Sequence, residues 1–457
     1  MTTLAAPDTN LVSMKDLPRP PLHPMLGWAA FWVAPDYARS QFDKRGERMY
    51  VDVPLIPPML FTSSPEDAHA VFTDRSGALL LGEALRRLAP HELVFGTEMI
   101  DWFNGENHAA LRRKVSPAFH GNALRGYEQA IADAAQTRLQ EWPLDRPIRL
   151  QEHMLTLGRD VIMSVVFGVT QPERRARLEE ALIELDHLAV SPGLKARYVT
   201  AMAMRGHWLP YPRMDRINAK LDAVALEEIA YRRANPSDEP RTDSLEVFLQ
   251  IQADDPDGML SDDMIASFLR LLLVAGYETT GVTLSWVVER IARHPEVLTR
   301  LDEAIADGDD DYVDAVITET MRMRPALPVT LRYAVEDVEV NGMLVPAGTV
   351  VMIYINAIQN RADIYPEPDR FNPERFVGVR PDPRTWLPFG GGAHRCLGGA
   401  FSMFEARVLL KTILTHRAIE PDTSSGERID QHRGVLLQPH NGARVTLRSR
   451  QAELSKP

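Results

Sequence analysis

The residues most able to do chemistry surround the single cysteine of this 457-residue chain. Cys396 closes a glycine-rich segment, Phe389-Gly-Gly-Gly-Ala-His394-Arg-Cys396-Leu-Gly398, which leads into an apolar-periodic helix. Glycines let the backbone approach a large flat ligand, while loop amides and a helix N-terminus turn positive ends toward sulfur. Such surroundings lower a thiol's pKa, so we expect Cys396 to be held as thiolate. A buried cysteine beside a glycine turn is the alternative interpretation.

A second candidate lies in the middle of a long apolar helix. Ser261, followed by two aspartates, is typical of a helix start, because a hydroxyl cap and an acidic first turn satisfy free amides and the dipole. We expect this helix to end near Arg293. From Phe268 to Gly276 it is apolar on nearly every face apart from Arg270, so it should be buried and cross the centre of the molecule.

That helix contains the sequence Ala275-Gly-Tyr-Glu278-Thr279-Thr280. An unpaired buried carboxylate is strongly disfavoured, so Glu278 should be paired, protonated or open to water. The Thr279 hydroxyl has two interpretations. It can serve an acid-base reaction together with Glu278, or it can bond back to the carbonyl of Ala275 and merely bend the helix.

Two further groups have helical spacing. Glu319 and Arg322 lie one turn apart, but such a pair contributes only ~0.2–0.5 kcal/mol on an exposed helix and alone indicates no function. His108 and Arg112 also lie one turn apart, and both side chains can reach one anionic ligand. A solvated basic face is the alternative for this second pair.

The whole set, in this order, resembles the cytochrome P450 family. The family's haem-binding loop runs Phe, two residues, Gly, one residue, a basic residue, one residue, Cys, one residue, Gly. The places are filled by Phe389, Gly392, His394, Cys396 and Gly398. The resemblance implies that Cys396 is the axial ligand of a haem iron, where a thiolate favours O–O cleavage. It covers nearly the whole chain.

The resemblance also assigns roles to the other motifs. It implies that the central helix opens over the iron at Ala275, that Thr279 steadies dioxygen, and that Glu278 relays protons through water. The haem propionates are then bound by His108, Arg112, Arg332 and His394. Arg375, from the segment Pro368–Phe376, joins Glu319 and Arg322 in a structural triad, which we assign to the scaffold because the cost of burying charge offsets the attraction.

The resemblance implies a mainly α fold with minor β (α+β), in which a long central helix lies over a haem and the sheets are small and peripheral. We expect a polar leader over residues 1–16 and one catalytic domain over 17–457. A strand pair is predicted within 48–62, and Asn-Gly turns predict hairpins at Asn341-Gly342 and Asn441-Gly442. Residues 26–34 are expected to form a packed helix.

Composition limits the classes of function. A net charge of −12 argues against a general nucleic-acid surface, and a single cysteine excludes an intrachain disulfide framework and suits a reducing cytosol. No signal peptide is recognised, and no run reaches the ~20 apolar residues of a membrane span. We therefore expect a cytoplasmic enzyme with no transmembrane anchor and no nucleic-acid partner.

The favoured function is a monooxygenase that uses haem b and O2 to oxidise a lipophilic small molecule such as a fatty acid, terpenoid or steroid. By analogy, the substrate contacts residues 78–99, 187–210, Val274, Ala275 and 327–331. Electrons would come from NAD(P)H through a separate ferredoxin, or flavodoxin, with its reductase. A ferredoxin is expected to dock near Arg112, Arg113, Lys114 and Arg395. A peroxide-driven peroxygenase and a non-catalytic haem or lipophile binder are the alternatives.

Overall fold

The computed structural model describes residues 11–21, 35–54, 56–88, 99–169, 171–189, 191, 193–194, 211–237, 241–255, 258–422, 425–430 and 435–450. The predictions made for residues 1–10, 26–34, 89–98 and most of 190–210 fall outside these ranges. Within the expected leader, strand β1 (Val12–Ser13) pairs in parallel with β8 (Met343–Val345), so contact with a sheet begins before residue 17.

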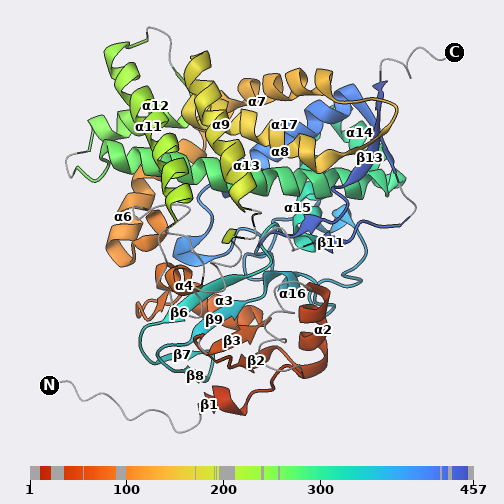
Figure 1. Cartoon of the computed structure of the whole chain (residues 1–457). Coiled ribbons are helices and arrows are strands. Elements are labelled where there is room, and N and C mark those ends of the chain that lie inside the picture. Colours follow the sequence, from red (N-terminus) through yellow and green to blue (C-terminus); the bar gives the residue numbers. More distant parts are fainter. Residues whose placement is uncertain are drawn as a thin grey trace.

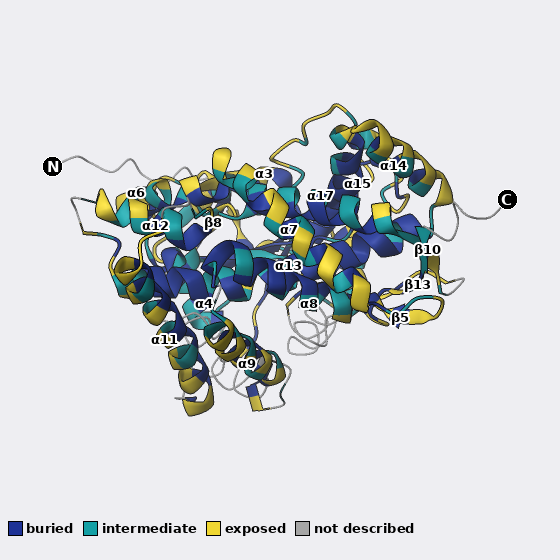
Figure 2. Cartoon of the chain, turned by 90° about the horizontal axis from the view of Figure 1, so that it is seen from above, coloured by how far each residue is buried: buried dark blue, intermediate teal, exposed yellow. Residues whose placement is uncertain are grey.

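The central helix is present as predicted. Helix α13 (Asp262–Ala292) begins after Ser261, whose Oγ accepts a hydrogen bond from the Met264 N–H at 3.1 Å. It runs through the helical half of the molecule, where its residues are largely buried (Figures 1 and 2). By length and composition it could span a membrane, but 61% of its most apolar window is buried inside the protein. We therefore assign it as a core helix.

Neighbouring helices pack on α13 at close range. A Cβ at Gly158, on α8 (Leu150–Ile162), would lie 3.0 Å from the Tyr277 carbonyl oxygen, and one at Gly281 would lie 3.1 Å from the Leu155 side chain. Small residues therefore set the α8–α13 distance. The other α-helices of the described residues are α2 (Pro35–Arg45), α3 (Pro65–Phe72), α4 (Leu81–Leu88), α6 (Gly105–Val115), α7 (Asn122–Glu141), α9 (Pro172–Ala189), α11 (Pro212–Ala234), α12 (Ser244–Ala253), α14 (Pro295–Asp307), α15 (Asp310–Met323), α16 (Ile355–Gln359) and α17 (Gly399–His416).

Among the described residues, the largest sheet has five strands in the order β2-β3-β9-β6-β4. The strand pair predicted within 48–62 forms its edge, with Met49 opposite Phe61 and Tyr50 opposite Leu60. This sheet lies on the opposite side of the molecule from α9 and α11 (Figure 1). The strands are β2 (Arg48–Val51), β3 (Met59–Thr62), β9 (Val350–Ile353), β6 (Thr330–Ala334) and β4 (Leu79–Leu80).

One predicted hairpin is confirmed. Strand β7 (Val338–Val340) pairs with β8 across Asn341 and Gly342, whose φ values of 46° and 76° are those an Asn-Gly turn supplies. With the other small sheets, this bears out the expected class, mainly α with minor β.

The second hairpin is wrong. The strands that flank Asn441 and Gly442 belong to different sheets: β12 (Gln438–Pro439) pairs with β11 (Ile429–Asp430), whereas β13 (Arg444–Ser449) pairs with β10 (Arg417–Pro421) and β5 (Pro147–Arg149). Two physical features oppose pairing across the turn. Pro439 has no N–H to donate, and the Gly442 carbonyl accepts the N–H of Gln151 at 3.0 Å.

Candidate functional site

The cysteine loop is a short, closed structure that precedes α17. The Cys396 N–H donates to the Phe389 carbonyl at 2.9 Å, and the Gly390 N–H donates to the Leu387 carbonyl at 2.8 Å. The Phe389 ring lies edge-on to Trp386, with centroids 5.7 Å apart. Phe389 therefore holds Cys396 in place through its carbonyl, and its ring packs the loop against Trp386.

Two of the glycines before the cysteine lie against another part of the protein. Gly392 has φ +67°, and a Cβ there would lie 1.9 Å from the Phe72 carbonyl oxygen; one at Gly391 would lie 2.4 Å from the Phe72 ring. Both glycines are therefore needed for close contact with the end of α3, and the predicted approach of a ligand to this loop stays a prediction. At Gly398 a Cβ would meet no protein atom within 4 Å, so the protein leaves room beside that residue.

The predicted lowering of the Cys396 pKa is also corrected. Cys396 is accessible to solvent at the surface of its loop, yet it is surrounded by protein, and this burial raises the pKa of its thiol. The Gly398 N–H and the positive charges of Arg395 and Arg112 act in the opposite direction but do not outweigh burial. Burial in the polypeptide therefore disfavours the thiolate, and a metal cation bound to the sulfur would favour it.

The middle of α13 carries the predicted acid-alcohol pair in an accessible position. Ala275 is exposed, although Leu273 and Tyr277, two residues before and after it, are buried. Glu278 and Thr279 are half-buried. The Thr279 hydroxyl donates to the Ala275 carbonyl at 2.7 Å, which is the geometry of the structural alternative. The helix is continuous at this point, so the expected opening does not interrupt it.

Glu278 is set up to exchange a proton near neutral pH. Burial, followed by the negative charge of Asp186, raises its pKa to about 7. Its Oε1 accepts a hydrogen bond from Gln438 Nε2 at 3.3 Å, which acts against the shift. A general acid works best when its pKa lies close to the operating pH, so the environment of Glu278 suits proton relay.

Two histidines from distant segments meet beside the cysteine loop. His108, on α6, is 2% exposed, and its ring lies 4.1 Å from that of His394. His108 Nε2 and His394 Nδ1 are buried without hydrogen-bond partners in the described chain. His394 Nδ1 lies 3.5 Å from Asp101 Oδ1. Burial and the neighbouring His394 lower the pKa of His108 to about 4, so His108 is neutral at pH 7.

Neither of the two predicted arginines near this cluster forms an ion pair with the described part of the chain, although the charge of Asp101 acts on both. Arg332 is 4% exposed and donates to the Leu331 carbonyl at 2.8 Å, and its burial lowers the pKa to about 10. Arg112 is half-buried, and burial lowers its pKa. Buried cations without counter-ions are costly, so this region is electrostatically complementary to an anionic ligand.

The predicted structural triad is assembled on α15 and the segment that contains Arg375. Arg322 and Glu319 are fully buried and form a bidentate pair, with Nε–Oε2 at 2.6 Å and Nη2–Oε1 at 3.0 Å. Arg375 Nε lies 3.5 Å from Glu319 Oε1. Arg322 also donates to the carbonyls of Gln359 and Pro368, which fastens the segment after α16 to α15.

Comparison with known proteins agrees with this geometry. The family described as Cytochrome P450 matches residues 18–446 of the chain. The chain belongs to the cytochrome P450 family. The match extends from the proline-rich N-terminal segment to strand β13 and includes every motif described above.

Named relatives lie in mycobacteria. Cytochrome P450 137 of Mycobacterium tuberculosis is 35% identical over 381 residues, which cover 83% of this chain and 79% of the relative. Cytochrome P450 135B1 of Mycobacterium bovis is 35% identical, with coverages of 86% and 82%. Cytochrome P450 138 of Mycobacterium bovis is 32% identical, with coverages of 92% and 93%. These names assign no substrate.

Membership implies a haem cofactor held by a thiolate, and the residues present fit it. The histidine nitrogens without hydrogen bonds, on His108 and His394, and the guanidinium groups of Arg112 and Arg332, which form no ion pair with the described residues, offer donors for two carboxylates. Cys396 supplies a thiol that is accessible on the same loop. Asp101 departs from this positive character, since it places a carboxylate among the proposed propionate ligands.

Sequence reasoning missed three residues of the site. Asp101 stands alone in the apolar run Met99–Phe103, and an isolated acid in such a run is a usable signal. Glu405 is a lone acid within the apolar turns of α17, and it is fully buried next to Thr280. No pattern in the sequence around Gln438 indicates its role, because it contacts Glu278, which lies 160 residues earlier in the chain.

Proposed function

We propose that this cytochrome P450 inserts one oxygen atom of O2 into a C–H bond or double bond of a lipophilic small molecule. For hydroxylation the balance is R–H, O2, two electrons and two protons giving R–OH and water. NAD(P)H supplies the electrons through a separate ferredoxin, or flavodoxin, and its reductase. The proposal places this activity in one domain over residues 17–457, working in the cytoplasm.

The observation that carries the proposal is the acid-alcohol pair in the middle of α13. Glu278, with a pKa of about 7, can take a proton from water and give it up again near neutral pH. The hydroxyl of Thr279, one residue away, can pass a proton or donate a hydrogen bond to dioxygen as it is reduced. Neither a peroxide-driven enzyme nor a passive binder needs this pair, so its presence favours the monooxygenase.

The cofactor we propose is haem b, held by Cys396 through iron and by His108, His394, Arg112 and Arg332 through the propionates. When bound, a thiolate-ligated haem supplies the activation of dioxygen and the oxidation of carbon. His108, which is neutral, can donate through one ring nitrogen, while the two arginines supply the positive charge. Phe389 holds the loop, and Ala275 leaves space on the side of α13.

The substrate is proposed to lie beside Ala275 and the segment Leu327–Leu331. Ala275 is exposed, and Leu327 has 41% of its surface exposed although it is a large apolar residue. Val329 and Leu331 pack against the apolar cluster that contains Trp102. These surfaces suit a lipophilic substrate, since ligand sites are mostly apolar with a few polar groups.

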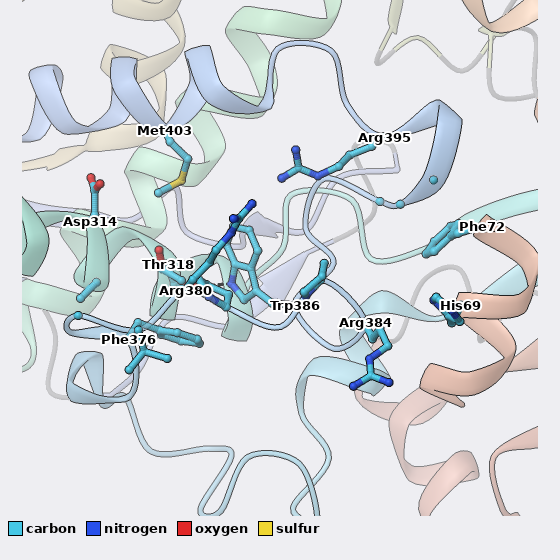
Figure 3. Close-up of a pocket in the computed structure, with 18 of the residues that line it drawn as sticks. His69, Phe72, Asp314, Thr318, Phe376, Arg380, Arg384, Trp386, Arg395 and Met403 are labelled. Atoms are coloured by element: carbon cyan, nitrogen blue, oxygen red, sulfur yellow. Dashed lines mark hydrogen bonds between the residues drawn. The ribbon is translucent and has the colours of Figure 1, made fainter. Parts of the chain in front are cut away.

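The electron donor is proposed to dock at a hollow of about 820 Å³ behind the cysteine loop. Its wall includes Gly390–Gly392 and Arg395 of the loop, together with Arg380, Arg384 and Trp386. Figure 3 shows Arg380 and Arg395 extending into the hollow near Trp386. The Trp386 ring contacts Phe389, whose carbonyl accepts the Cys396 N–H, so a docked acidic protein would be separated from the thiol by little more than the loop.

This hollow alters the predicted docking patch. Lys114 forms an ion pair with Asp255, and Arg112 is half-buried, so both are poor contributors to a docking surface. Arg113 and Arg395 remain exposed. Arg380 and Arg384 were not predicted, because they follow the triad segment in sequence and reach the loop only in the fold. An acidic ferredoxin complements this arginine cluster despite the net charge of −12.

The test of the proposed function is isotopic. The holoenzyme is supplied with NADPH, a ferredoxin, its reductase and a lipophile that shifts the haem Soret band, under isotopically labelled O2. One labelled oxygen atom per product molecule is expected, with label also appearing in water. Product that forms only with hydrogen peroxide would indicate the peroxygenase, and no product with any Soret-shifting ligand would indicate a binder.

A further inference from the structure

Glu278 is held by a neutral amide instead of a cation. Gln438 Nε2 donates to Glu278 Oε1 at 3.3 Å. No lysine, arginine or histidine of the described ranges lies within ion-pair distance of Glu278. A cation at that position would fix the carboxylate form, whereas an amide can serve both forms, because its N–H donates to a carboxylate oxygen and also to the carbonyl oxygen of a carboxylic acid.

Gln438 is held firmly against α13. It lies on β12 and is 6% exposed. The residue before it, Leu437, accepts a hydrogen bond from Trp286 Nε1 of α13 at 2.7 Å, and its own N–H donates to the Ala326 carbonyl at 2.9 Å. The backbone beside Gln438 is therefore tied to the same helix that carries Glu278, two turns further along.

A third side chain sets the direction in which the amide points. Gln151, at the start of α8 and 4% exposed, donates through Nε2 to Gln438 Oε1 at 2.9 Å. With its oxygen occupied by Gln151, the Gln438 amide turns its N–H₂ toward Glu278. Two consecutive hydrogen bonds, from Gln151 to Gln438 and from Gln438 to Glu278, thus connect α8, β12 and α13.

The other charged groups near Glu278 form a separate cluster. Asp186 of α9 accepts a hydrogen bond from the hydroxyl of Tyr277, the neighbour of Glu278, and pairs with Arg159 of α8 at 3.1 Å. His187 adds a positive influence on Asp186. Since Arg159 and Tyr277 are already engaged by Asp186, Gln438 is the group left to bind Glu278 directly.

We propose that Gln438 is a positioning residue of the proton relay, which holds Glu278 in place in both protonation states, with Gln151 orienting its amide. The inference rests on the proposed function, because it concerns the acid of that reaction. The amide at residue 438 and the acid at residue 278 therefore act as a unit.

The experiment replaces the Gln438 amide by side chains that each favour one protonation state of Glu278. Gln438→Lys introduces a cation and should lower the pKa of Glu278 by about 1–3 units. Gln438→Leu removes the hydrogen-bond donor that the described residues supply to Glu278 and should raise its pKa. Gln41→Leu, at a similarly buried glutamine of α2, is the matched control. Because Glu278 delivers protons in its protonated form, the high-pH limb of product formation should move to lower pH with lysine and to higher pH with leucine.

A second readout does not require turnover. Infrared difference spectra of the resting holoenzyme between pH 5 and 9 follow the protonated carboxyl of Glu278, identified by its loss in Glu278→Gln. The inference expects this band to titrate in the same order, lysine below wild type below leucine, with Gln41→Leu unchanged. An identical titration in all four proteins overturns it, even if every one of them oxidises substrate. Should Gln438→Leu not fold, the lysine variant alone decides.

Failure of the proposed function would look different. If the wild-type enzyme makes no oxygenated product while the infrared titration still follows the variants, the positioning role stands and the monooxygenase assignment falls. If product forms and neither the pH limb nor the infrared band moves, the assignment stands and the role of Gln438 falls.

Discussion

The imidazole rings of His108 and His394 lie 4.1 Å apart, although one comes from α6 and the other from the loop that ends at Cys396. Each ring has a buried nitrogen that makes no hydrogen bond with the described chain, His108 Nε2 and His394 Nδ1. The contact brings the two segments together at the proposed propionate site and gives the following prediction.

Replacing either histidine should weaken haem binding without unfolding the protein. A hydrogen bond to a charged group is worth about 1.5–3 kcal/mol, so His108→Ala and His394→Ala should each increase haem loss by roughly 10- to 100-fold. The measurement is the rate of haem transfer to an excess of a scavenging apoprotein. Arg113→Ala, at the exposed residue after Arg112, is the control, and an equal increase there would argue against specific propionate contacts.

The Glu319–Arg322 pair should be essential to folding, unlike a comparable pair on the surface. Both partners are fully buried, so Glu319→Gln leaves Arg322 with a poorer partner and should cost about 3–5 kcal/mol of the free energy of unfolding. Glu374, which pairs with Arg300 and is 49% exposed, provides the control. Glu374→Gln should cost less than about 1 kcal/mol in the same chemical denaturation series. Similar losses in both would contradict the scaffold role.

Glu405 should make the protein less stable as the pH rises. Burial raises its pKa to about 8, so the folded state keeps a proton that the unfolded state, with a pKa near 4.5, releases. The contribution of Glu405 to the free energy of unfolding is fully present below pH 4.5 and is lost as the pH rises to 8 and above. Glu405→Gln removes this dependence, so its stability relative to wild type should rise between pH 5 and 8 by up to about 1.4 kcal/mol per pH unit.

The check is denaturant unfolding of both holoproteins across that pH range, comparing only their difference. A difference that does not change with pH would show that Glu405 is ionised in the folded protein. Neither carboxyl oxygen of Glu405 makes a hydrogen bond of good geometry with the described residues, although Thr280 lies close enough to act against the shift.

Electron delivery should depend on the arginines of the hollow and on salt. Arg380→Glu and Arg395→Glu should slow reduction by an acidic ferredoxin, and the wild-type rate should fall as ionic strength rises, because the Debye length shrinks to ~10 Å at 0.1 M. Stopped-flow reduction under carbon monoxide measures this. Arg370→Glu, whose side chain is 67% exposed and which does not line the hollow, should have little effect. If all three substitutions slowed reduction equally, the rate would depend on the net charge of the protein and not on a docking site at the hollow.

Much of the site could be predicted because its parts are local in sequence. The loop from Phe389 to Gly398, the cap at Ser261 and the turn at Asn341-Gly342 each contain within a few residues the features that fix them. What failed depends on partners far along the chain. Burial raises the pKa of Cys396, and contacts with the start of α8 hold the turn at Asn441-Gly442. The contact of Gly392 with Phe72 is a further feature that no local pattern indicates. Gln438 is recognisable only once α8, α13 and β12 are seen together.

The most direct test of the account is the fate of electrons in Thr279→Ala, with Thr279→Ser as the control that keeps a hydroxyl. The Thr279 hydroxyl donates to the Ala275 carbonyl at 2.7 Å, so a purely structural role predicts a small change in stability and unchanged chemistry. Positioned proton transfer contributes ~10² to 10⁴ in rate, so the monooxygenase account predicts continued NADPH consumption by Thr279→Ala, with hydrogen peroxide replacing most of the product. Thr279→Ser should retain coupling. An unchanged ratio of product to NADPH in Thr279→Ala would contradict the account.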